Sequence, residues 1–595
     1  MSAALLLIMV FSLSLYFIPA LLSRRASYDS IRKFVVSSDG ATAERFQNSS
    51  VAYAAQMSTF GPFFIWGLSG DTVGATINTA FFFLGLLMVW VFRVPMLAFL
   101  DERLLKDTSI TPHAFIAAPY GDSRLIRTAS SWITIIALLG IIIAEMMGVA
   151  AVLAPLLPHT PDAKYIVVAL MFFMMVLYTL TGGNDGVMRS EVLQLRSAYC
   201  ALAMFALVYL FSLSKPITSN PQIATLLAMI SVASAVLFSG QVVSLGSLLK
   251  MTPDESTGGF EAKFQTFERA VAIITLLSLA AISLSSAYLF VFRDIAAFSS
   301  TSVINWFQNK SIPAIGLFSL AVLPLFYQVA DITNWQRLAA TTSQKDLAAK
   351  KLIGKHMIWF AIEASGFWFL LLLLGGLAAS SIALTSTSIP STFEDFVKGL
   401  VANQDPIHFF ALSLLVVAVF AIALSTMDSV LSAVICAFRY DILELPKPMD
   451  SLATQSDHKT QQDIFRGAKF AVGFSIVAMA AIVVSERWLQ FATDQFVAVL
   501  LAFYSAQLAF VPLIVGGLIK VPSKILPSEK FAFAALVIGA ASGFFCSFYG
   551  IFSSDEFLSW AAIPASIVTG SVVYVIGVIR STAASGDSIA DGSVR

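Results

Sequence analysis

Charged residues are scarce in this chain, and cysteine and histidine are scarcer still. Only 12% of its 595 residues are charged, against about 25% in a typical soluble domain. The three cysteines, Cys200, Cys436 and Cys546, lie apart inside apolar runs without CxxC spacing, so neither a disulfide framework nor a zinc site is indicated. There are five histidines, and neither an HExxH nor a GxxxxGK[ST] string occurs. The sequence therefore does not predict an enzyme.

An excess of charge of either sign is also missing. Lys and Arg total 36, Asp and Glu total 36, and no basic stripe appears, which argues against a nucleic-acid partner. Hydrophobic residues, in contrast, make up 58% of the chain, and the mean hydropathy is +0.83. So much apolar surface needs a lipid bilayer to cover it, and the chain is predicted to be an integral membrane protein of many helices.

Fifteen apolar stretches of about 20 residues are long enough to cross a bilayer as helices. They lie near residues 3–22, 50–70, 75–98, 129–157, 165–181, 190–213, 222–249, 268–292, 313–333, 356–384, 407–436, 467–485, 492–519, 531–550 and 557–579. The first has no basic residue before it and is followed by Arg24 and Arg25, the reverse of a cleavable signal peptide. It is predicted to be a retained helix with its N-terminus outside.

The basic residues agree with this orientation. If the helices alternate from an outside N-terminus, six basic residues lie in exterior loops, namely Lys164, Lys215, Arg293, Lys310, Lys398 and Arg487. The other 30 of the 36 lie in or beside cytoplasmic segments, as the positive-inside rule requires. With an odd number of spans, the polar tail 581–595 lies in the cytoplasm, and we expect the protein in the cell membrane.

Two spans are poorly suited to be continuous helices. The second contains Gly61, Pro62 and the run 67–70, and the ninth contains Pro313 and Pro324. Glycine and proline leave backbone groups without helical partners, and in a membrane these groups must face protein, water or a ligand. Broken helices at matching places in two halves indicate the binding site of a secondary transporter. Ordinary kinks in a helical bundle are the alternative.

Four short motifs occur in one order along the chain. They are Gly67–Gly70, Tyr178–Gly183 followed by Ser190, Glu191 and Gln194, Trp335–Ala340, and Ala421–Ser429 followed by Arg439–Ile442. Together with the loop 108–127, they resemble the sodium:solute symporter family, which includes sodium/glucose and sodium/proline cotransporters. The resemblance implies an all-α polytopic membrane protein with a LeuT-type core of five-plus-five inverted repeats and additional peripheral helices.

On that resemblance the chain divides into six segments. They are 1–49, an extra N-terminal helix and a cytoplasmic loop; 50–213, the first repeat with spans 2–6; 214–312, an inserted hairpin of spans 7 and 8; 313–519, the second repeat with spans 9–13; 520–580, spans 14 and 15; and 581–595, the polar tail. The role of the hairpin and the oligomeric state stay open.

The eleventh span carries a candidate sodium site. Sodium is a hard cation that oxygen ligands hold best, and in a helix the carbonyl of Ile422 points toward Ser425 and Thr426. A kink would bring one carbonyl and two hydroxyls together. The resemblance adds the backbone carbonyls of Met57 and Phe60, at the break of the first core helix. The alternative is that both hydroxyls bond back to the preceding turn.

Acidic residues inside spans are costly, and each is a functional candidate. Glu145 lies mid-span in the fourth helix and Glu363 lies in the tenth. Either can sense protons or bind an amino group, or it can be a protonated carboxyl bonded to a neighbouring helix. Glu191, at the cytoplasmic entrance of the sixth span, is expected to guide the ion's exit. A simple ion pair with Arg189 is its alternative.

The broken spans also carry the candidate solute ligands. Asp331 stands where the family often has Asn-Gln, and its carboxylate favours a cationic or amine-bearing ligand or a cation of the coupling system. Gln328, one turn nearer the membrane centre, offers a donor and an acceptor. Phe63 and Trp66 flank the first break and either close over the solute or simply pack. Asp428 matches an acidic family position, and structural capping explains it equally well.

These observations together predict a sodium-coupled symporter that imports a small polar organic solute by alternating access, with sodium, the solute and the lipid bilayer as its partners. Two alternatives stay open. One is a transporter-like sensor that binds solute and signals to a partner protein. The other is a proton-coupled symporter that uses Glu145 or Glu363. Which solute is carried, and with how many sodium ions, is not readable from the sequence.

Overall fold

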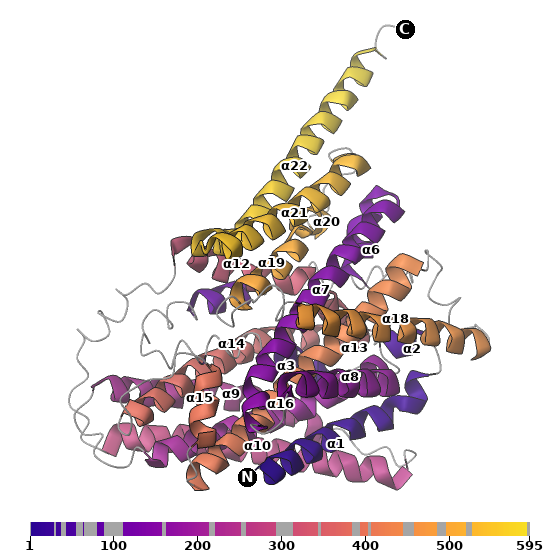
Figure 1. Ribbon diagram of the computed structural model, residues 1–595. Helices are drawn as coiled ribbons and strands as arrows, with labels where there is room; N and C mark the ends of the chain where they lie inside the picture. The colour runs from indigo at the N-terminus through magenta and orange to yellow at the C-terminus, as the bar shows by residue number, and fades with distance from the viewer. Residues whose placement is uncertain are drawn as a thin grey trace.

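The computed structural model is almost entirely helical (Figure 1). It describes residues 2–28, 31–36, 43–54, 64, 80–88, 111–157, 162–212, 221–250, 258–292, 313–342, 347–383, 393–402, 406–443, 457–484, 496–518 and 526–591. Strands do not occur among these residues. Ten of the described helices are long and apolar enough to cross a membrane, and a bent pair of helices is an eleventh candidate.

The described helices follow one another along the chain in this order. The first half contains α1 (Ser2–Ser27), α2 (Ile31–Val35), α3 (Ala43–Ala54), α6 (Pro112–Ala117), η1 (Ala118–Tyr120), α7 (Arg124–Leu153), η2 (Ala154–Leu156), α8 (Ala163–Ser212), α9 (Pro221–Lys250) and α10 (Gly258–Phe292). The second half contains α12 (Ala314–Ala330), α13 (Ile332–Thr342), α14 (Leu347–Ala383), α15 (Phe393–Ala402), α16 (Pro406–Cys436), η3 (Ala437–Leu443), α18 (Asp457–Val484), α19 (Phe496–Leu508), α20 (Val511–Leu518), α21 (Glu529–Ser553) and α22 (Glu556–Asp591).

Helix α16 forms the centre of the bundle. Every residue from 418 to 436 is buried, and the helix contacts α1, α3, α7, α8, α13 and α18. A helix that is apolar and buried on all sides belongs to the core of a large protein. By contrast, α21 and α22 run side by side against α19, and the C-terminal end of α22 extends past the other helices (Figure 1).

Helix α8 turns back on itself at Gly183. Its 50 residues would extend for about 75 Å as a straight helix, more than twice the apolar thickness of a bilayer. The hydroxyl of Tyr178 and Nε2 of Gln194 lie only 3.3 Å apart, although 16 residues of straight helix would separate them by about 24 Å. The chain therefore forms two arms, which correspond to the predicted spans 165–181 and 190–213.

Only glycine suits the corner of α8. Gly183 has φ +58° and ψ −164°, a backbone conformation that strains residues with a side chain. A Cβ at this position would also lie 2.6 Å from the carbonyl oxygen of Phe34. The corner therefore packs directly against the backbone of α2.

The break predicted in the ninth span is confirmed. Helices α12 and α13 are bent by 50°, with Asp331 between them in an extended conformation. The Oδ1 of Asp331 accepts a hydrogen bond from the amide of Thr333 (3.2 Å), and the Thr333 hydroxyl donates to Oδ2. Asp331 is thus the N-cap of α13.

The other predicted spans fall on the described helices as follows. Spans 4 to 15 coincide with α7 through α22, with spans 5 and 6 on the two arms of α8. Span 1 falls on α1 (Ser2–Ser27), which includes the apolar helical segment Val10–Arg24. Spans 2 and 3 lie largely outside the described residues, as does the predicted break at residues 61–70 apart from Phe64. Helix α3 already begins at Ala43, before the predicted start of span 2 at residue 50.

Candidate functional site

The candidate sodium ligands on α16 are buried in the core. Ile422, Ser425 and Thr426 are at most 2% exposed. The Thr426 hydroxyl lies 3.3 Å from the carbonyl oxygen of Ile422 and donates to it, so for this residue the bond back to the preceding turn is present. Ser425 differs, because its Oγ has no hydrogen-bond partner within the described part of the chain.

The oxygens at this point of α16 suit an alkali cation. Ser425 keeps both lone pairs and its proton, Thr426 keeps its lone pairs, and the Ile422 carbonyl has a second lone pair. Neutral oxygens are hard ligands that fit sodium better than a transition metal. No group of three or more His, Cys, Asp or Glu side chains suited to a metal occurs among the residues described. Met57 and Phe60 lie outside the described residues.

Asp428 joins α16 to both arms of α8. Its Oδ2 accepts from the Tyr178 hydroxyl and lies 3.4 Å from the hydroxyl of Ser190, and its Oδ1 lies 2.6 Å from the amide of Ser429. The carboxylate is fully buried, and such a group needs this many donors. These contacts give Asp428 a structural role beside the candidate sodium ligands.

Glu191 forms a buried ion pair with Arg337. One guanidinium nitrogen of Arg337 donates to Oε1 of Glu191, and the two side chains are 3% and 0% exposed. Arg189, the suggested alternative partner of Glu191, has its Nε 3.2 Å from Asp185. The partner of Glu191 is 146 residues away along the chain.

Two serines complete this ion pair. Ser49 of α3 and Ser429 of α16 each donate to Glu191, and Arg337 donates to both serine oxygens, at 2.7 and 2.6 Å. The guanidinium also lies over the ring of Tyr53, 4.7 Å from its centroid, an attractive cation–π geometry. Four helices, α3, α8, α13 and α16, therefore meet at one charge pair.

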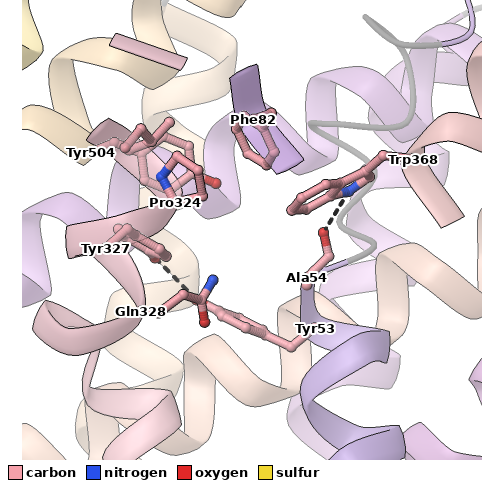
Figure 2. A pocket seen from close by; sticks show the side chains of 9 residues that line it. Tyr53, Ala54, Phe82, Pro324, Tyr327, Gln328, Trp368 and Tyr504 are labelled. Atoms are coloured by element: carbon pink, nitrogen blue, oxygen red, sulfur yellow. Dashed lines mark hydrogen bonds between the residues drawn. The ribbon is translucent and has the colours of Figure 1, made fainter. Parts of the chain in front are cut away.

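A small pocket lies beside the break between α12 and α13 (Figure 2). Its lining consists of Tyr53, Ala54, Phe82, Leu323, Pro324, Tyr327, Gln328, Trp368 and Tyr504. The cavity volume is about 60 Å³, which is room for a few water molecules. A larger solute therefore needs the surrounding helices to move apart.

Two hydrogen bonds join residues of the pocket lining. The hydroxyls of Tyr53 and Tyr327 lie 3.1 Å apart, and Trp368 Nε1 donates to the carbonyl of Ala54 at 3.1 Å (Figure 2). Gln328 lines the pocket, and its side-chain oxygen accepts from Asn334 at 2.8 Å.

The other predicted solute ligands are placed differently. Asp331 is fully buried and is not part of the pocket lining, because both of its oxygens cap α13. Its role toward a solute stays a prediction. Phe63 and Trp66 lie outside the described residues.

Glu363 is held by neutral donors from three helices. Its carboxylate accepts from Gln47 (2.7 Å), Gln241 (2.6 Å) and the Tyr199 hydroxyl (2.9 Å). Gly240 lets α9 come this close, because a Cβ there would lie 2.9 Å from Glu363 Oε2. The carboxyl is thus bonded to neighbouring helices, and the predicted hairpin supplies one of its donors.

Glu145, the other acidic candidate, is fully buried in α7. Its role in proton or ion coupling stays a prediction.

A further charged cluster lies where α16 ends. The Asp441 carboxylate lies 2.8 Å from the Thr111 hydroxyl, from His113 Nδ1 and from Arg127 Nε. Arg127 also donates to the carbonyl of Tyr440 at 2.8 Å. This cluster ties the segment before α7 to the π-helical turn η3, and such turns are frequent at functional sites.

Comparisons with known proteins support the fold. Neither a protein-family profile nor a curated protein matches the chain. A solved structure, the substrate-bound outward-open state of a Na⁺-coupled sialic acid symporter that reveals a novel Na⁺-site, is similar to it with a TM-score of 0.55. The match covers 96% of this chain and 98% of that chain at 14% sequence identity. The chain is therefore a multi-pass membrane protein with the LeuT-like fold of a polytopic transporter.

Proposed function

We propose that this protein is a sodium-coupled symporter that imports a small polar organic solute by alternating access. It lies in the cell membrane with its N-terminus outside and its C-terminus in the cytoplasm, as the basic residues indicate. Sodium binds at Ile422, Ser425 and Thr426, together with the carbonyls of Met57 and Phe60. The solute binds beside Gln328 at the break between α12 and α13, as expected for broken helices in transporters.

The unpartnered hydroxyl of Ser425 is the observation that carries this proposal. An ordinary buried serine on the same helix, Ser413, donates to the carbonyl of Phe409 at 2.8 Å. Ser425 forms no such bond to any described residue, although leaving a buried polar group unpaired costs about 1–3 kcal/mol. A bound cation offsets part of this penalty, because the hydroxyl oxygen donates a lone pair to it.

Sodium supplies enough free energy for uptake. One charge that moves through about 100 mV is worth ~2.3 kcal/mol, and a tenfold sodium gradient adds ~1.4 kcal/mol. The sum, ~3.7 kcal/mol per ion, supports roughly a 500-fold solute gradient.

Thermal unfolding of the purified protein, in sodium and in choline at equal ionic strength, tests the site. Sodium at about 100 times its dissociation constant stabilises the folded state by about 2.7 kcal/mol. We expect the variant Ser425→Ala/Thr426→Ala to lose this stabilisation and Ser413→Ala to keep it. Sodium stabilisation of wild-type size in the double variant refutes the site.

Uptake assays separate the proposal from its alternatives. At fixed pH, replacing sodium by choline abolishes uptake by a sodium symporter and spares uptake by a proton symporter, whereas a sensor shows no uptake in either salt. The solute is sought by thermal shift against a library of sugars, amino acids and carboxylates, with and without sodium. Sialic acid is its first member, because a symporter of that solute shares the fold.

A further inference from the structure

The span that contains α19 and α20 is interrupted near its middle. Helix α19 ends at Leu508 and α20 begins at Val511. Pro512 has no amide hydrogen, so it cannot donate to the carbonyl of Leu508 as a helical residue would. The amide of Phe510 bonds only three residues back, to the carbonyl of Gln507 at 3.1 Å. Backbone groups that lack regular helical hydrogen bonds therefore lie within the candidate span Val499–Leu518.

Gln507, at this interruption, has a side chain that the fold leaves unsatisfied. The residue is fully buried, yet neither Oε1 nor Nε2 has a hydrogen-bond partner in the portion of the chain that is described. A glutamine amide offers two donors and one acceptor oxygen. An unpaired group of this kind needs a reason beyond folding, such as a ligand or an ordered water.

Two neighbours along the chain, one on α19 and one in the turn after it, locate this amide. Tyr504, three residues earlier, lines the pocket, and its ring lies 4.7 Å from that of Tyr327 (Figure 2). Phe510, three residues later, lies 5.9 Å from the ring of His113, which belongs to the Asp441 cluster. Residues three apart lie on the same side of a helix. Gln507 therefore lies between the pocket and the Asp441 cluster.

Hydrogen bonds and an ion pair hold the helices around the pocket together in this structure. The bond between Tyr53 and Tyr327 joins two residues of the pocket lining, and the pair of Glu191 with Arg337 joins four helices. When these contacts separate, a solute that leaves the pocket toward the predicted cytoplasmic side passes the level of Gln507.

We propose that Gln507 lines the solute's exit route and that its amide donates to, and accepts from, a hydroxyl, amide or carboxyl group of the passing solute. This inference rests on the proposed transport function. It assigns to α19 a solute contact one turn beyond the pocket, and it gives the unpartnered amide a ligand that is present only during transport.

Cysteine labelling tests the inference without knowledge of the solute. In the full chain with Cys200, Cys436 and Cys546 replaced by serine, Gln507→Cys is compared with Ser505→Cys. Ser505 is equally buried, but it packs toward α21, because a Cβ on Gly543 would lie 2.5 Å from its Oγ. We expect N-ethylmaleimide to modify the cysteine at 507 at least tenfold faster than the one at 505. Equal, slow rates overturn the inference.

Comparing the labelling rates in sodium and in choline distinguishes the exit-route inference from the proposal of sodium coupling. A labelling rate at 507 that changes when choline replaces sodium supports both the exit route and sodium coupling. Fast labelling at 507 that ignores sodium supports the exit route and counts against sodium coupling.

Stability gives an independent test, because removing an unpartnered amide costs the fold nothing. Gln507→Met, which keeps the volume, is expected to melt at the same temperature as wild type or higher, and to transport more slowly. Gln241→Met is the matched control and should melt lower, because Gln241 donates to Glu363 at 2.6 Å. A lower melting temperature for Gln507→Met shows that the amide has a partner in the folded protein and overturns the inference.

Discussion

The buried pair of Glu191 and Arg337 allows a quantitative test of how the four core helices are held together. We consider three variants: Glu191→Gln, Arg337→Met and the two changes combined. Each single change leaves one charge buried without its partner, in a site where the side chains are 0% and 3% exposed. Breaking a buried pair in this way costs about 3–5 kcal/mol.

The double variant is expected to be much less damaging than the two single changes added together. It removes both charges, and exchanging a buried ion pair for neutral groups of similar volume is often close to neutral. Ser49 and Ser429 still lose part of their hydrogen bonding, at about 1 kcal/mol each. The two single costs sum to about 6–10 kcal/mol and the double variant costs about 2 kcal/mol, so a coupling energy of about 4–8 kcal/mol in favour of the pair should appear in the double-mutant cycle.

Chemical unfolding in detergent, followed by tryptophan fluorescence, measures the four free energies. Arg466→Gln serves as the control, because the Arg466 side chain is 64% exposed and lies 3.7 Å from Asp463. An exposed pair of that kind is worth about 0–1 kcal/mol. The loss of unfolding free energy in the double variant could equal the sum of the two single losses. In that case Glu191 and Arg337 do not interact, and the proposed role of this ion pair in joining the four helices is refuted.

Two further predictions concern the corner of α8 and the carboxylate on α14. Gly183→Ala should lower the free energy of unfolding by at least about 1–2 kcal/mol, because φ is +58° and left-handed backbone is costly for alanine. Unchanged stability in the same unfolding assay contradicts the requirement for glycine at the corner of α8. Glu363→Gln should cost about 1–3 kcal/mol, because its amide turns a donor toward Gln47 or Gln241, while uptake keeps its dependence on sodium. Uptake that loses a dependence on pH in this variant would instead favour proton coupling.

Features with a local physical cause were predictable from the sequence. The break at Asp331 lies in an apolar span that contains two prolines, although α12 continues past Pro324 to Ala330, and the corner at Gly183 lies within a double glycine. Both depend on backbone chemistry within a few residues. The cap that Asp331 forms on α13 also has a local signal, an aspartate at the start of a helix with threonine two residues on, although the sequence alone suggested a solute ligand there.

Contacts between distant segments were not predictable in the same way. Arg189 was the natural partner for Glu191 because it is close in sequence, yet Arg337, from another helix, reaches the carboxylate. The apolar pattern shows which residues are buried and does not show which helices meet. Gln507 did carry a signal, a lone amide in an apolar span, but its significance depends on the absence of a partner among the described residues.

The arrangement of these residues gives a physical route for the proposed coupling between ion and solute. Ser425 lies one helical turn, about 6 Å, from Ser429, which bonds to Arg337. Arg337 lies on α13, and α12 on the other side of the break carries Tyr327 at the pocket. Any shift of α16 that forms or empties the sodium site therefore acts on the charge pair, and through α13 on the pocket. Because an ion shifts a conformational equilibrium only through contacts that differ between the two states, the proposed function requires that the contact of Ser429 with Arg337 differ between the sodium-bound and sodium-free protein.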